Sequence, residues 1–242
     1  MSTVSIISAL SQSTLPFIDE AHDSIKSLIL PKGFDTKWYI QHDGDSEPIQ
    51  RGWFNDSNVF YEHNGRHLGA AGTRNQALLR TDSEFVISLD SDDLFQKDAL
   101  TELLRGFENN GVMWSAGAWH ELHADGSIQP WRSPLFEGVR EVGWIYEEIM
   151  RLDKTPFSMN PILYKREALV QAGGWPGFPE WEDTILLTVV SGHHRGWATD
   201  KLVGLYRRHE NSYSKSEIFQ SSKPKMYRYI KEIGKLQTLP PE

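Results

Sequence analysis

The 242-residue sequence predicts a single α/β domain built on a mostly parallel β-sheet flanked by helices. Two observations lead to this prediction. In the first 110 residues, short apolar runs rich in Val, Ile, Phe and Tyr alternate with segments of helical apolar spacing. The hydrophobic content of 39% and the charged content of 24% are ordinary for a globular chain, and cysteine is absent. The chain must therefore hold its fold by a buried core, without disulfides or thiolate metal sites.

The first half of the chain is expected to contain four strands and three helices. We expect the strands at 4–8, 37–43, 58–63 and 85–90, and the helices at 16–30, 69–80 and 97–107. The first helix places Ile18, Ala21 and Ile25 on one side, and Pro31 follows it. Because strands alternate with helices, right-handed crossovers should make these strands parallel.

The pattern changes after about residue 110, where a smaller antiparallel sheet is expected. Two strands should flank the Ala-Asp-Gly-Ser turn at 124–127. Further elements are expected in order: a helix at 141–152, a strand and a short helix within 160–175, a helix at 182–190, one or two strands within 194–209, and a surface helix at 223–236.

The overall charge and the chain start limit the function classes. The formal net charge is -8 and no basic stripe is present, so binding to nucleic acid is not expected. The N-terminal segment lacks the basic region of a signal peptide, and no apolar run reaches membrane-spanning length. We therefore expect a cytoplasmic enzyme without a membrane span.

An acidic cluster follows the apolar run in the segment FVISLDSDDLF. Asp90, Asp92 and Asp93 come at the end of this strand, and Asp43 ends the second strand. Ligands in open α/β sheets bind beyond the carboxyl ends of strands, so both positions should face one crevice. Carboxylate oxygens suit Mg²⁺ or Mn²⁺. A metal site is favoured, and the alternative is that Asp92 or Asp93 caps the following helix.

Two other metal-binding readings of this cluster fail on the residues that follow it. A calcium loop starting at Asp90 would need an oxygen ligand, Gly and Glu where Leu94, Phe95 and Thr101 stand. A haloacid-dehalogenase-type phosphatase would need Thr or Val at Leu94.

Several basic residues could act beside a phosphorylated ligand. The guanidinium of Arg74, just inside the helix at 69–80, could fork onto a diphosphate. Arg207 and Arg208 could offset phosphate charge, and His209 could be a metal ligand. Each of these residues could instead be solvated or structural.

A second acidic cluster, Glu182 and Asp183, follows the turn-rich segment GGWPGFPEW. A carboxylate near a metal-bound diphosphate could act as general base toward an incoming hydroxyl. The alternative is that both acids stabilise the N-terminus of a helix.

Six motifs in this order, VSIIS, IQHDGDS, GAAGTRNQAL, FVISLDSDDLF, GGWPGFPEWEDT and LYRRHENSYS, closely resemble the inverting family 2 glycosyltransferases of the GT-A fold. The resemblance covers roughly residues 3–213. It implies that 1–110 bind a nucleotide sugar, that 111–213 carry the acceptor side and catalytic base, and that 214–242 form a helical tail.

The resemblance also implies contacts to the nucleotide sugar. Backbone around Ser8 and Ala9 would touch the base, Asp43 would hydrogen-bond it, and Arg74 would lie near the base and diphosphate. The implied nucleotide-sugar contacts are Ser8, Ala9, Asp43, Arg74, Asp90 and Ser91.

The family pattern further implies a metal site and a catalytic base. Asp92 would bind Mn²⁺ or Mg²⁺ directly, Asp90 would contact it through water or touch the ribose, and His209 would be a third ligand. Asp183 matches the catalytic base, with Glu182 beside it.

The acceptor is less defined than the donor. A UDP-sugar is the favoured donor, while the acceptor could be a carbohydrate, a lipid-linked sugar, a small molecule or a protein. Trp175, Trp181 and Trp119 could stack on an acceptor sugar or belong to the core. The Gln-x-x-Arg-Trp signature of processive synthases is absent, which favours single addition. The sequence leaves open a sugar-phosphate nucleotidyltransferase and a non-catalytic nucleotide-sugar-binding module of the same fold.

Overall fold

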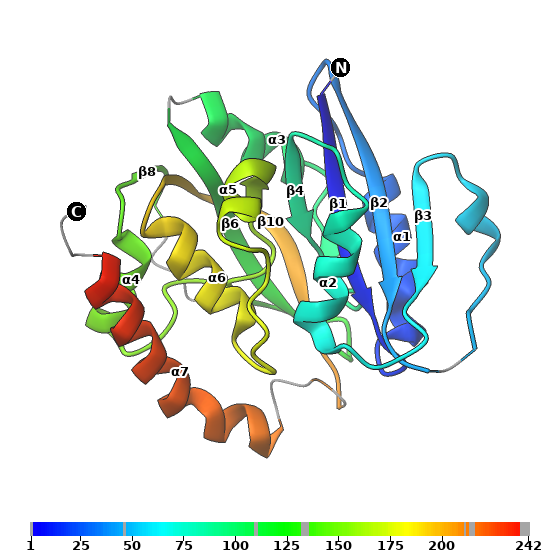
Figure 1. Ribbon diagram of the computed structural model, residues 1–242. Coiled ribbons are helices and arrows are strands. Elements are labelled where there is room, and N and C mark those ends of the chain that lie inside the picture. The colour runs from blue at the N-terminus through cyan, green and yellow to red at the C-terminus, as the bar shows by residue number, and fades with distance from the viewer. Residues whose placement is uncertain are drawn as a thin grey trace.

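The computed structural model describes residues 2–45, 47–108, 111–131, 136–210, 212 and 216–237. Within these residues, helices flank one twisted ten-stranded sheet, whose main strand order is β3-β2-β1-β4-β9-β6-β10-β5 (Figure 1). Among the same residues, none of the helices combines the length and apolarity needed to cross a membrane.

The first half of the chain folds as its alternating pattern predicts. β1 pairs in parallel with β2 and β4, and β2 pairs in parallel with β3. These strands are β1 (Ser2–Leu10), β2 (Phe34–His42), β3 (Val59–His63) and β4 (Phe85–Ser88). Parallel strands covered on both faces bury continuous apolar runs, and five consecutive residues of β1, Val4 to Ser8, are buried.

The helices lie close to their expected positions. They are α1 (Ile18–Lys26), α2 (Gly69–Leu79), α3 (Ala99–Leu104), α4 (Trp144–Leu152), α5 (Arg166–Gln171), α6 (Glu182–Ser191) and α7 (Glu217–Gln237). Short 3₁₀ turns are η1 (Leu15–Phe17), η2 (Gly52–Asn55) and η3 (Arg105–Glu108). The first helix is shorter than predicted, because the chain enters it through η1 and leaves it after Lys26. In Figure 1, α7 (orange to red) runs along the outside of the molecule near α4 and α6.

The second half differs from the expectation of a separate antiparallel sheet. β9 (Leu163–Lys165) pairs antiparallel with both β4 and β6 (Val112–His123), so it joins the two halves into one sheet. β6 then pairs in parallel with the long β10 (Arg195–Arg208), whose pairing contains register shifts. The antiparallel strands, attached to this same sheet, are β5 (Leu94–Phe95), β7 (Ile128–Pro130) and β8 (Gly138–Arg140).

Two of the tryptophans pack against glycines of β10. A Cβ atom at Gly196 would lie 1.9 Å from the Trp114 ring, and one at Gly204 would lie 2.2 Å from the Trp119 ring. Both rings are buried. Trp119 is therefore a core residue, and the hypothesis that it stacks on a sugar is wrong.

Candidate active site

A cleft of about 740 Å³ lies at the carboxyl ends of β1, β2 and β4 and extends to the start of α6. It brings together most of the site residues predicted from the sequence. Those that line it are Ala9, Asp43, Arg74, Asp90, Ser91, Asp92, Trp181, Glu182, Asp183 and His209. The two acidic clusters, far apart in the sequence, thus face one space.

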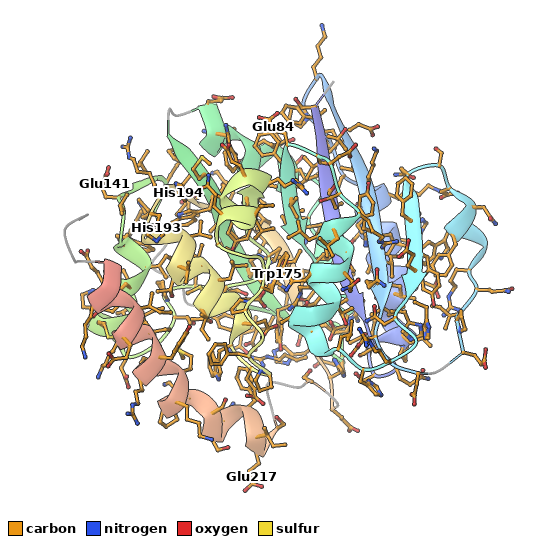
Figure 2. The ribbon with its side chains drawn as sticks, viewed as in Figure 1. Glu84, Glu141, Trp175, His193, His194 and Glu217 are labelled. Carbon is orange, nitrogen blue, oxygen red and sulfur yellow. The ribbon has the colours of Figure 1, made fainter. Side chains whose placement is uncertain are left out.

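Two predicted site residues do not line the cleft. Ser8 is buried in β1, where its hydroxyl donates to the Leu89 carbonyl oxygen at 2.6 Å and accepts from Trp38 Nε1 at 2.9 Å. Trp175 is buried in the interior beside α2, where Figure 2 shows it, and Asn75 bonds its backbone. A buried indole cannot stack on an acceptor sugar, so this prediction for Trp175 is wrong.

Asp43 sits directly after β2 and ties that strand end to the start of α2. Its carboxylate accepts hydrogen bonds from the backbone N–H groups of Leu68 at 2.7 Å and Gly69 at 3.2 Å. Burial alone would raise the pKa of Asp43, but hydrogen bonds from Leu68, Thr73 and Asn64 outweigh it, and the pKa lies below its ordinary value. Asp43 is therefore a fixed negative charge at the rim of the cleft.

The turn after β4 is held by β10. Arg207 donates from Nε to the Asp92 carbonyl oxygen at 2.8 Å and from its backbone N–H to Asp93 Oδ1 at 2.9 Å. Ser91 donates to Thr14 Oγ1 at 2.7 Å. The alternative that Asp92 or Asp93 caps the following helix is wrong, because Asp98 occupies the N-cap of α3. Asp92 and Asp93 therefore do not act as helix caps.

His209, directly after β10, reaches the side chain of Asp92. Its Nε2 lies 2.9 Å from Asp92 Oδ2, and the ring packs on Phe17 with centroids 4.8 Å apart. Burial and the neighbouring Asp90 raise the pKa of Asp92, while His209 lowers it. Sequence reasoning expected Asp92 and His209 to act together, and the fold places them in contact.

Arg74 joins the two acidic clusters. Its Nη2 donates to Asp90 Oδ1 at 2.5 Å, and its Nη1 donates to Glu182 Oε1 at 2.6 Å. Nη1 also lies 3.8 Å from Asp183 Oδ1. Burial opposes the guanidinium charge, yet the three carboxylates outweigh it and hold the pKa of Arg74 well above its ordinary value. The guanidinium thus forks onto protein carboxylates, and its predicted contact with a diphosphate stays a prediction.

Asp183 lies in the first turn of α6, with its side chain 19% exposed. The indole Nε1–H of Trp175 donates to Asp183 Oδ1 at 2.7 Å. Burial raises the pKa of Asp183 to about 7, against the opposing effect of Arg74. A carboxylate with such a pKa, opening onto a cleft, is suited to accept a proton near neutral pH.

Several cleft residues were missed by sequence reasoning. Trp131 and Tyr206 line the cleft beside the predicted Arg208, whose guanidinium lies 4.7 Å from the centroid of the Tyr206 ring. Phe219 and Gln220 of α7 also line the cleft. Only the Arg207-Arg208 pair carried a signal, and the fold turns Arg207 toward Glu20 while Arg208 faces the cleft.

The acidic and histidine side chains of the cleft are candidate ligands for a divalent metal. The residues that the structure describes contain no group of three His, Asp or Glu side chains already arranged around a metal position. Asp92 and His209 are nevertheless in contact, and Asp90 is 32% exposed beside them. Carboxylate oxygens of this kind suit Mg²⁺ or Mn²⁺, which usually complete their shell with water and substrate phosphate. These residues fit a cation that a bound diphosphate helps to hold.

Comparison with known proteins identifies the family of this chain. The family model for glycosyl transferase family 2 matches residues 10–161, which include the first acidic cluster. An uncharacterized glycosyltransferase, RC0461 of Rickettsia conorii, is 29% identical over 125 residues, covering 50% of this chain and 20% of that protein. The chain thus spans about a fifth of the length of this curated relative.

Solved structures share the fold across the whole chain. TarS 1-349 of S. aureus in complex with UDP-GlcNAc superposes with a TM-score of 0.72 at 17% identity, covering 100% of this chain and 68% of that one. TarS 1-349 in complex with UDP gives a TM-score of 0.66 at 16% identity, covering 95% and 70%. The chain belongs to glycosyl transferase family 2 and has the GT-A fold.

Proposed function

We propose that this enzyme transfers a sugar from a nucleotide diphosphate sugar to an acceptor hydroxyl, with inversion and with the help of a divalent metal. The observation that carries the proposal is the position of Asp183. It opens onto the same cleft as Asp90 and Asp92, is oriented by Trp175, and has a pKa of about 7. A candidate base and an acidic turn that line one cleft are the two groups that this transfer needs.

The donor end of the cleft is assigned to Ala9, Asp43 and the turn after β4. Backbone at Ala9 and the carboxylate of Asp43, which both line the cleft, would meet the nucleotide base. UDP is the favoured nucleotide, because the structurally similar TarS was solved with UDP and with UDP-GlcNAc. Arg208, which also lines the cleft and pairs with Glu121, would add positive charge near the diphosphate together with Arg74.

Asp90, Asp92 and His209 would hold the cation. When bound there, Mn²⁺ or Mg²⁺ would offset the negative charge that builds on the departing diphosphate. The chain's own contribution is to fix the turn, through the hydrogen bonds that Arg207 makes to Asp92 and Asp93.

The transfer step is a single displacement at the anomeric carbon. The acceptor oxygen attacks from the face opposite the diphosphate and forms the new C–O bond. The bond from the anomeric carbon to the β-phosphate oxygen breaks, and its electron pair leaves with the nucleotide diphosphate. Asp183 receives the acceptor's proton. Glu182 is held by Arg74 at 2.6 Å, so it positions the arginine and leaves the base role to its neighbour.

The division of labour follows the two halves of the chain. Residues 1–110 would bind the donor, 111–213 would supply the base and the acceptor side, and 214–242 would add the C-terminal helix to the cleft wall. Single addition is proposed because the chain lacks the Gln-x-x-Arg-Trp signature of processive synthases.

A thermal-shift screen of UDP, GDP, dTDP and CDP, each with Mn²⁺ or with EDTA, tests the donor site. Ligand at 100 times its dissociation constant should add about 2.7 kcal/mol of stability, which is roughly 5–10 °C for a domain of this size. We expect the largest rise with UDP and Mn²⁺, and little of it in EDTA. The absence of a shift with every nucleotide would refute the proposal. Release of pyrophosphate in place of UDP during turnover would identify a nucleotidyltransferase.

A further inference from the structure

A second, smaller groove of about 360 Å³ lies beside the cleft, between α7 and the segment leading into α6. Its lining is mostly apolar and includes Phe178, Ile185, Ile218 and Met226. Its charged lining residues are Glu180 and Lys225, whose charges cancel. The groove therefore suits an uncharged apolar group, and its volume lies at the small end of the usual range for ligand pockets, roughly 300–1,000 Å³.

The groove and the cleft share a wall. Pro179, Glu180 and Trp181 line both of them. The next two residues along the chain are the acid pair, including Asp183. The segment that separates the groove from the cleft therefore leads directly into the residue proposed as catalytic base.

Trp181 is held in an unusual backbone conformation to form this wall. Its φ of +64° lies in the left-handed region, which bulky non-glycine residues rarely occupy. The indole stacks on Phe219 with centroids 4.2 Å apart, and its Nε1 donates to Ser222 Oγ at 2.9 Å. Strained residues that are held by several contacts concentrate at functional sites. The contacts from α7 fix the partition between the two spaces.

The apolar surface continues outward from the groove. Phe178 is 37% exposed, Ile218 is 64% exposed, and Tyr229 beside Phe178 is 41% exposed, with the two rings 4.7 Å apart. Grouped apolar side chains at a rim favour contact with an apolar ligand, because the contact removes their surface from water.

We propose that this groove binds the apolar aglycone of the acceptor, an alkyl or aryl group, while the acceptor's hydroxyl-bearing head passes Trp181 to reach Asp183. The inference rests on the proposed transferase function and names its acceptor class. The acceptor is amphipathic: a polar head that receives the sugar, joined to an uncharged apolar part. The wall that the groove shares with the cleft at Pro179–Trp181 favours an acceptor over an occupant that never approaches the base.

Paired probes that differ only in their aglycone test this assignment. The full chain is titrated with octyl β-D-glucopyranoside, kept below its micelle concentration, and with methyl β-D-glucopyranoside, and binding is followed calorimetrically. We expect the octyl compound to bind at least about tenfold more tightly, since burying several methylene groups is favourable. Ile218→Glu should weaken octyl binding at least about fivefold, because it places a charge in the groove.

A matched variant separates the groove from general surface effects. Leu79→Glu makes the same aliphatic-to-acid change at a 75% exposed position of α2, outside both spaces, and should leave octyl binding unchanged. Thermal melting of both variants reports whether each is folded. Equal binding of the octyl and methyl compounds, or equal effects of the two substitutions, would overturn the proposal.

The remaining outcomes distinguish the groove from the transferase function. A UDP–Mn²⁺ thermal shift without any octyl preference overturns the groove assignment alone. Octyl preference without any nucleotide shift overturns the acceptor role, because the proposed function has then failed. Ile218→Glu could also abolish self-association or binding to phosphatidylglycerol vesicles, in assays where octyl glucoside does not compete. The groove would then bind a second copy of the chain or a lipid surface, and the proposal would be wrong.

Discussion

The two acidic clusters of the cleft use the same residue types in different surroundings. Asp92, in the turn after β4, contacts the imidazole of His209. Asp183, in the first turn of α6, accepts a hydrogen bond from the neutral indole of Trp175. Burial raises the pKa of both carboxyls, and for Asp183 it does so to about 7.

This difference shows how the neighbouring side chains can give chemically equivalent carboxylates different properties. The first cluster has a histidine and an arginine-held backbone around it, an arrangement suited to holding a cation. In the second, Trp175 donates to Asp183 while Arg74 holds Glu182, and the largely buried Asp183 is suited to exchanging a proton near neutral pH. Arg74 touches both clusters, so each one also influences the charge of the other.

The sharpest way to break the comparison is Asp183→Asn. The amide keeps the shape of the side chain but cannot accept the acceptor's proton, so kcat for transfer should fall by about 10²–10⁴-fold. UDP binding in the presence of Mn²⁺ should stay near the parent value, as measured by thermal shift. Glu167→Gln, on the exposed surface of α5, is the control and should retain full activity. Near-parent turnover of Asp183→Asn would remove this residue from the base role.

The next largest effect is expected from Arg74→Ala. Removing the buried guanidinium leaves Asp90 and Glu182 uncompensated, which should lower the free energy of unfolding by about 3–5 kcal/mol in urea titrations at neutral pH. Arg74→Lys keeps the charge without the fork and should lose less. Arg105→Ala, which breaks an exposed pair with Glu102, should change stability far less. An equal cost for Arg74→Ala and Arg105→Ala would contradict the bridging role.

His209→Ala tests the first cluster alone. It removes the partner of Asp92, so the Mn²⁺ concentration needed for half of the UDP thermal shift should rise by about 10–100-fold. At saturating Mn²⁺, and at a pH on the plateau of the kcat profile, kcat should change much less. His193→Ala, at an exposed histidine far from the cleft (Figure 2), is the matched control. The same Mn²⁺ requirement in parent and His209→Ala would separate this histidine from the metal site.

The smallest and most specific effect concerns pH. Asp183 must be deprotonated to accept a proton, so kcat should rise as the pH increases through about 7 and then level off. The Trp175 hydrogen bond stabilises the charged carboxylate and lowers this pKa. Trp175→Phe should therefore move the acidic limb of the kcat profile to higher pH while largely preserving the packing. An unmoved limb would show that Trp175 does not act through Asp183.

The local sequence pattern predicted the first half of the chain well, because its strands and helices are separate, strongly patterned segments. The parallel pairing of β1, β2 and β4 follows from alternation, and the strand-end acids then fall at one edge of the sheet. The second half was predicted less well. β9 has only three residues, yet its pairing with both β4 and β6 decides that there is one sheet and not two.

The candidate site divides in the same way. Asp43, Asp90, Asp92 and Asp183 were found from residue type and position, since carboxylates at strand ends and helix starts carry a readable signal. The family resemblance also led us to expect His209 beside Asp92, although the two lie 117 positions apart. The contact between Arg74 and Glu182, 108 positions apart, was not foreseen. Nothing local marks Trp175 as a hydrogen-bond donor to Asp183, or Arg74 as a bridge between carboxylates.

The sequence by itself determined the family, the order of the donor-half elements and the identity of the acids in the cleft, because these depend on short-range periodicity and on motifs. The tertiary structure alone decided which basic side chain lies beside which carboxylate, which tryptophans are buried, and that an apolar groove lies beside the cleft. The physical reason is that charge pairing and burial depend on distances in space. Folding brings together residues that are far apart along the chain, and the sequence alone does not state which ones.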